Sequence, residues 1–152
     1  MDIPITFKIY LFWKNIFFKT KDHPEVKISK KGEGVRSVLF FLPEKKEEAK
    51  IINYFVKVEN PLPGYDIGLV CSENSKMFYP HIDNVKLFTY KEEDLNYFNT
   101  IKSPLIKNDI KSICYDAIVD LNIDFCAATT MLAFELEVPL KIGFDSSINR
   151  KI

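Results

Sequence analysis

Residues 115–144, YDAIVDLNIDFCAATTMLAFELEVPLKIGF, read as a buried strand, a polar turn, an apolar helix and a second strand. Residues 117–119 form a continuous apolar run, which is typical of a strand covered on both faces. The helix that follows is apolar around nearly its whole circumference, so it must also be buried. A strand, a helix and a strand in this order indicate one right-handed unit of a parallel sheet.

Three further apolar runs, at residues 37–42, 66–71 and 85–90, predict additional strands. Residues 44–58 have acids in the first turn and apolar residues along one side, which predicts a helix. Residues 92–111 predict one or two short helices, because Pro104 interrupts any longer one. We therefore expect one Rossmann-like α/β domain over residues 35–152, with three layers and a mainly parallel sheet of about five strands.

Residues 1–34 precede this domain and have a different character. Apolar residues recur at helical spacing between residues 5 and 17 among several lysines, which predicts a basic amphipathic helix, followed by a polar tether. The helix either lies in a lipid headgroup region or packs on the domain or on a second copy of it. We expect a cytoplasmic protein, peripheral on the inner membrane face or homo-oligomeric through this helix. The contacting residues would be Lys8, Phe12, Trp13, Lys14 and Phe17.

Composition excludes several classes of partner and cofactor. The 21 basic and 21 acidic side chains balance, so we expect no binding to nucleic acid. The spacing of Cys71, Cys114 and Cys126 matches neither a zinc site nor a redox pair, which indicates buried, reduced thiols. The turn after the first strand, Pro43-Glu44-Lys45, lacks the glycines that let backbone amides approach a phosphate. We expect neither a metal nor a nucleotide cofactor.

Ligands of open parallel sheets bind beyond the carboxyl ends of the strands. Asp120 and Asp124, four residues apart at one strand end, suggest either a metal or acid–base pair or, as we favour, a strand end and a helix cap. His23 and His81 are interpreted as solvated loop residues. The predicted ligand-binding edge consists of Pro43, Glu44, Ser72, Asn122, Asp124, Asp145 and Ser146.

The order of these elements resembles a known family. Residues 115–121 (YDAIVDL) and 142–145 (IGFD), joined by a helix with small residues, are similar to the end of the N-terminal domain of glycosyltransferase family 9, the lipopolysaccharide heptosyltransferases. Residues 35–43 would be that family's first strand, so the resemblance extends over roughly 110 residues. Stand-alone domains of this type in small Bacteroidota proteins are a second resemblance.

The resemblance implies a catalytic aspartate in a glycine-aspartate turn after the first strand, but this chain has Pro43-Glu44-Lys45 there. It also implies a second domain for the nucleotide-sugar donor, which 152 residues do not supply. Glu44 is the weak candidate for a catalytic acid. We expect a non-catalytic domain that binds a partner or sugar-like ligand at the membrane face. The alternatives are a glycosyltransferase subunit whose donor domain comes from another chain, and a dimerising scaffold.

Overall fold

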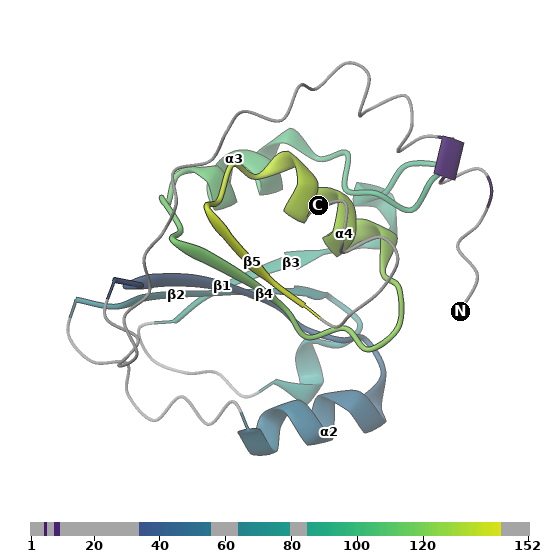
Figure 1. The fold of residues 1–152 in the computed structure, drawn as a ribbon. Coiled ribbons are helices and arrows are strands. Elements are labelled where there is room, and N and C mark those ends of the chain that lie inside the picture. The colour runs from purple at the N-terminus through teal and green to yellow at the C-terminus, as the bar shows by residue number, and fades with distance from the viewer. Residues whose placement is uncertain (1–4, 6–7, 10–33, 56–63, 80–84, 144–152) are drawn as a thin grey trace.

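A sheet of five parallel strands forms the centre of the molecule (Figure 1). This is a computed structural model, and it describes residues 5, 8–9, 34–55, 64–79 and 85–143. The strands follow the order β3-β2-β1-β4-β5 across the sheet. Their bounds are β1 Ser37–Phe41, β2 Asp66–Ser72, β3 Val85–Tyr90, β4 Ala117–Asp120 and β5 Leu140–Ile142. The predicted α/β class with a mainly parallel sheet is confirmed.

Helices cover the two faces of the sheet unequally (Figure 1). Helix α2 (Lys46–Phe55) lies on one face, where it contacts the short 3-10 helix η1 (Lys76–Phe78). Helices α3 (Pro104–Lys111) and α4 (Ala127–Glu135) lie on the opposite face, and a second 3-10 helix, η2 (Glu92–Asp94), follows β3. This arrangement follows from right-handed crossovers, because the chain moves across the sheet one way from β1 to β3 and the other way from β3 to β5.

The side chains of the strands alternate between two cores. Under α3 and α4, Leu39, Phe41 and Ile118 of the sheet pack with Ile110 and Leu132 of the helices. On the α2 face, a second buried cluster joins the sheet to α2 and η1. Its members are Leu42, Ala49, Ile52, Leu69, Cys71 and Tyr79. These two buried layers explain why the strands read as continuous apolar runs.

A close contact between β2 and Tyr115, which lies two residues before β4, requires glycine at position 68. A Cβ atom there would lie 2.8 Å from Cδ1 of Leu39 and closer still to the phenol oxygen of Tyr115. Burial raises the pKa of Tyr115 to about 12. The ring of Tyr115 therefore packs directly against the backbone of β2, where a larger residue would displace it.

The element boundaries differ from the predicted ones by a few residues. Helix α4 begins at Ala127 with Cys126 as its N-cap, so the expectation that Asp124 caps this helix was wrong. Pro104 is the first residue of α3, where its missing N–H costs no helical hydrogen bond. Residues 92–111 accordingly contain two short helices, as predicted.

Candidate functional site

The strand order reverses between β1 and β4, so the turns that follow these two strands lie side by side at the carboxyl edge of the sheet. Phe41, the last residue of β1, is in register with Asp120, the last residue of β4. The backbone N–H of Leu121 donates to the carbonyl of Phe41 at 3.0 Å. Open α/β sheets place their ligands at such a point.

A tyrosine from β3 links the two turns. The Tyr90 hydroxyl donates to the Glu44 carboxylate at 3.0 Å and lies 3.8 Å from the sulfur of Cys126. Tyr90 is almost fully buried, and burial raises the pKa of its phenol well above the usual range. Glu44 is held by a neutral donor here, so this contact gives no sign that it acts as a base.

An ion pair crosses between the same two turns. Lys45 donates to the Asp124 carboxylate and lies 3.5 Å from Glu48 on α2. The hydrogen bond to Asp124 raises the pKa of Lys45. Asp124 therefore pairs with a residue 79 positions earlier in the chain. Among the described residues, no group of three or more His, Cys, Asp or Glu side chains could hold a metal ion.

Asp120 makes contacts on one side of its carboxylate. Its Oδ1 atom accepts hydrogen bonds from the backbone N–H of Asn122 at 3.1 Å and from the Asn122 side-chain amide at 2.7 Å. The same amide is 3.3 Å from the hydroxyl of Thr129 in the first turn of α4. Burial raises the pKa of Asp120. The predicted role of Asp120 in binding backbone at the strand end is confirmed.

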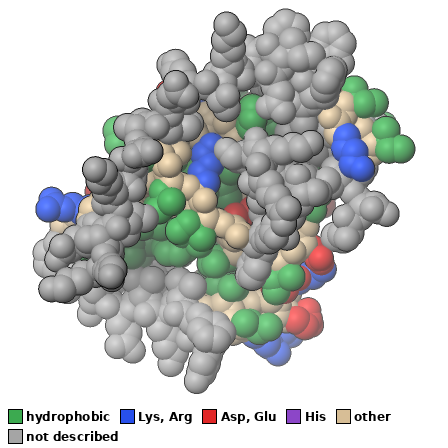
Figure 2. Space-filling view, viewed as in Figure 1, with side chains coloured by type: hydrophobic (Ala, Val, Ile, Leu, Met, Phe, Trp, Pro, Cys, Tyr) green, Lys and Arg blue, Asp and Glu red, His purple; other side chains and the backbone are tan. Residues whose placement is uncertain are grey.

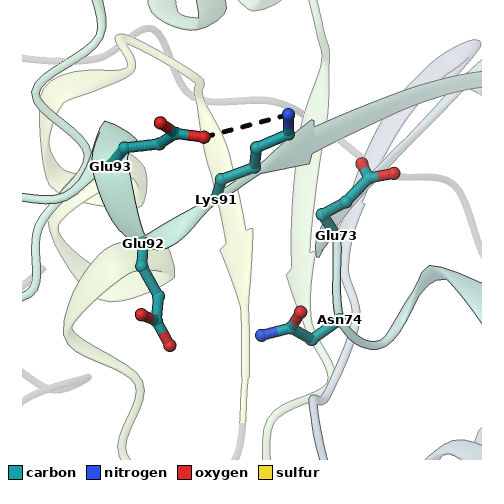
Figure 3. Close-up of a pocket in the computed structure, with 5 residues that line it drawn as sticks. All are labelled: Glu73, Asn74, Lys91, Glu92 and Glu93. Atoms are coloured by element: carbon teal, nitrogen blue, oxygen red, sulfur yellow. Dashed lines mark ion pairs between the residues drawn. The ribbon is translucent and has the colours of Figure 1, made fainter.

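An open pocket of about 620 Å³ lies further along the carboxyl edge, beyond β2 and β3 (Figure 3). Its lining residues are Glu73, Asn74, Lys91, Glu92 and Glu93. Figure 3 shows the Lys91 ammonium group between the carboxylates of Glu93 and Glu73, and its nitrogen is 3.9 Å from the Glu93 carboxylate. A hydrogen bond with Thr89 lowers the pKa of Glu73. The volume is in the usual range for small-molecule sites, and the lining carries three carboxylates against one ammonium group.

The structure places the predicted edge residues in different environments. Pro43 is buried, and its carbonyl accepts a hydrogen bond from the Tyr79 hydroxyl at 2.6 Å. Ser72 is also buried, and its carbonyl is bonded by Ser75. Glu44 is exposed, whereas Asn122 and Asp124 are half-buried. Asp145 and Ser146 lie outside the described residues.

Sequence reasoning missed the lining residues that follow β3. Residues 92–111 were predicted only to contain short helices, and Glu92 and Glu93 do begin one of these, η2. Their place in the pocket depends on β2 and β3 being neighbours, which brings the turn at Glu73 beside them. The usable signal was the shared carboxyl edge. Lys91 directly follows the third predicted strand, and Glu73 comes two residues after the second, which was predicted to end at Cys71.

Part of the predicted N-terminal amphipathic helix is described. Ile5, Lys8 and Ile9 are helical and exposed, with Ile5 at 75% and Ile9 at 53%. Figure 2 shows hydrophobic and basic side chains together at the place of this short helix. Phe12, Trp13, Lys14 and Phe17 lie outside the described residues. In the described part of the chain, no helix combines the length and apolar character that spanning a bilayer requires.

Comparison with known proteins gives no relative: no protein-family model, no curated protein and no solved structure matches this chain significantly. Any functional conclusion therefore depends on the geometry of the carboxyl edge and on the sequence itself.

Proposed function

We propose that this domain binds a hydroxyl-rich ligand of the sugar class at the carboxyl edge of its sheet and does not transfer a group to or from it. The observation that supports this most directly is the pocket lined by Glu73, Asn74, Lys91, Glu92 and Glu93. Carboxylate and amide oxygens accept hydrogen bonds, so they suit a ligand whose surface is rich in O–H donors. Three carboxylates and the Lys91 ammonium group line the pocket, and Lys76 lies 3.4 Å from Glu73. The remaining single negative charge disfavours phosphorylated ligands by charge repulsion.

The turn after β1 supports binding without transfer. Pro43 is buried, Glu44 accepts a hydrogen bond from Tyr90, and Lys45 bonds to Asp124. This turn has no glycine, and its acid and base are both engaged in contacts within the protein. The resemblance of residues 115–145 to the heptosyltransferases favours the sugar class of ligand. A catalytic subunit that works with a donor-binding chain is the alternative, and it would need Glu44 released from Tyr90.

Binding is tested by titrating the ¹⁵N-labelled full-length chain with maltotriose, with chitotriose and with UDP-glucose. We expect saturable amide shifts at residues 73–74 and 91–93 with at least one neutral trisaccharide and none with UDP-glucose. Glu92→Ala should abolish these shifts. Glu47→Ala, which removes an exposed acid of α2 that does not line the pocket, should leave them unchanged. Titrations without saturable shifts for either trisaccharide would contradict the proposal.

The absence of transfer is tested separately with UDP-glucose and ADP-glucose as donors. We expect neither hydrolysis nor transfer by the chain. Turnover that disappears in Glu44→Gln would instead support the catalytic alternative.

A second proposal concerns the partner surface, and the exposure of Ile5 and Ile9 favours it. These two apolar side chains are one helical turn apart and lie beside the charged Lys8. Apolar side chains beside lysines are typical of a helix that lies in a lipid headgroup region. We propose that the N-terminal segment holds the domain at an anionic membrane surface.

A further inference from the structure

Asp120 occupies a distinctive place in the fold. It is the last residue of β4, in register with the last residue of β1, where the strand order reverses. Its carboxylate is on the side of the sheet that α4 covers, because its partner Asn122 also contacts Thr129 in that helix. The side chain is therefore at the position where a ligand of an open α/β sheet is expected.

The two oxygens of this carboxylate differ in their contacts. Oδ1 accepts both hydrogen bonds from Asn122, whereas Oδ2 has no hydrogen-bond partner among the described residues. Among the described residues, the phenol oxygen of Tyr115 is the one fully buried side-chain nitrogen or oxygen atom that has no hydrogen-bond partner. Asp120 itself is half-buried, so its side chain is not sealed inside the core.

No described cation compensates the charge of Asp120. Lys45, the basic residue of the neighbouring turn, bonds to Asp124 and Glu48 instead. Burial raises the pKa of Asp120, which means that the ionised form is costly in the folded protein. An asparagine could accept the same two hydrogen bonds from Asn122 without that cost. The negative charge is therefore unexplained by the fold alone.

We infer that the Oδ2 atom of Asp120 accepts a hydrogen bond from a hydroxyl group of the bound ligand, as a second contact point beyond the pocket. This inference rests on the proposed function. Three inter-strand spacings of about 4.8 Å separate β3 from β4. A ligand that contacts both the pocket and Asp120 therefore spans on the order of 10–14 Å, so it is an oligosaccharide rather than a single sugar.

The first test follows the carboxyl ¹³C resonance of Asp120 through a pH titration of the full-length chain, with and without saturating maltotriose or chitotriose. A hydrogen bond from the sugar stabilises the ionised form, so the bound sugar should lower the pKa of Asp120. In Asp120→Asn, the affinity for the same trisaccharide should fall about tenfold or more, because a hydrogen bond to a charged group is lost. Asp109→Asn, an exposed carboxylate on α3, is the matched control and should bind normally.

The outcomes separate the two proposals. Trisaccharide shifts at residues 91–93 with an unchanged pKa of Asp120 and an unaltered affinity in Asp120→Asn would overturn the inference and leave the proposed function standing. Failure of both trisaccharides to bind would overturn both proposals. Thermal unfolding adds a readout that needs no ligand: Asp120→Asn should melt higher than the unmodified chain at pH 7. A lower melting temperature would assign Asp120 a purely structural role and overturn the inference.

Discussion

Two aspartates at opposite ends of β4 show how position in the fold changes the pKa of a carboxyl group. Asp116, just before the strand, accepts hydrogen bonds from the backbone N–H groups of Arg36 at 2.8 Å and Ser37 at 3.0 Å. These bonds lower the pKa of Asp116. At the other end, burial raises the pKa of Asp120. The first aspartate therefore joins β1 to β4. The second has one oxygen without a hydrogen-bond partner among the described residues, and its ionised form is costly because of burial.

Replacing Asp116 by Asn should destabilise the fold at pH 7 by about 1 kcal/mol, because charge-assisted bonds become neutral ones. The pKa of Asp116 is lower in the folded chain than in the unfolded chain. Its stabilisation is therefore complete above the unfolded pKa and is lost as the pH falls through the folded pKa. Urea unfolding of both proteins across pH 2–7 checks this. A stability difference that stays constant with pH would contradict the assignment.

Asp120→Asn should change the free energy of unfolding in the opposite direction, because it should stabilise the fold. The pKa of Asp120 is higher in the folded chain than in the unfolded chain, so its ionisation opposes folding. That cost is fully present above the folded pKa and disappears as the pH falls below the unfolded pKa. We expect the variant to be the more stable protein at neutral pH and the two unfolding free energies to converge in acid. Divergence in acid would show that the carboxylate is not the source of the difference.

At the scale of elements, an ion pair joins α3 to α4. These two helices lie on the same face of the sheet (Figure 1). Lys107 of α3 lies 2.6 Å from Glu135 of α4, and their side chains are only 22% and 16% exposed. Limited exposure reduces screening by solvent, so this pair contributes more than a typical surface pair. It connects helices that belong to different crossovers of the sheet.

A double-mutant cycle with Lys107→Met and Glu135→Gln should give a coupling energy of about 1 kcal/mol. Chemical denaturation of the four proteins measures it. The matched comparison is the exposed pair Lys91–Glu93, whose atoms are 3.9 Å apart and whose side chains are 60% and 78% exposed. We expect no measurable coupling for that pair. Equal coupling energies in the two cycles would mean that burial does not strengthen the Lys107–Glu135 pair.

Strands β1 to β4 were predictable from the sequence because each is a short, mostly apolar run that ends in polar residues or proline. The start of α4 was not, because Asp124 has the side chain of a helix cap but bonds to Lys45, 79 residues away. Pro104 was ambiguous for a related reason: proline ends one helix and begins another equally well. Local patterns identify an element, whereas its first residue is often decided by tertiary contacts.

At the scale of the whole molecule, the carboxyl edge joins residues that no local pattern connects. The pocket needs the turn at Glu73 beside the turn at Glu92, and Asp120 needs β4 beside β1. Both juxtapositions follow from the strand order, which the sequence did not determine. The Rossmann-like class was predictable, and so was the edge at which to search, but the particular side chains that meet there were not.

The N-terminal segment offers a test on the intact chain. We expect flotation with vesicles of phosphatidylcholine and phosphatidylserine that weakens as salt is added, since lysines are attracted to anionic lipid. Replacing Phe12, Trp13 and Phe17 by Ser should abolish flotation. The control replaces three exposed apolar residues of the domain, Met77, Tyr97 and Leu105, by Ser and should float normally. Flotation that survives loss of the aromatic residues, or an oligomer that dissociates instead, would contradict the membrane proposal.

The central place of β1 has a consequence for how the chain is made. Its neighbour β4 leaves the ribosome about 80 residues later, as the separation of Arg36 and Asp116 shows. At on the order of 5–20 residues per second, that delay is roughly 4–16 s. During this time one edge of an apolar strand is open to other nascent chains, and the long loop slows its closure. Overproduction should therefore depend on chaperone supply more than the modest size of the protein suggests.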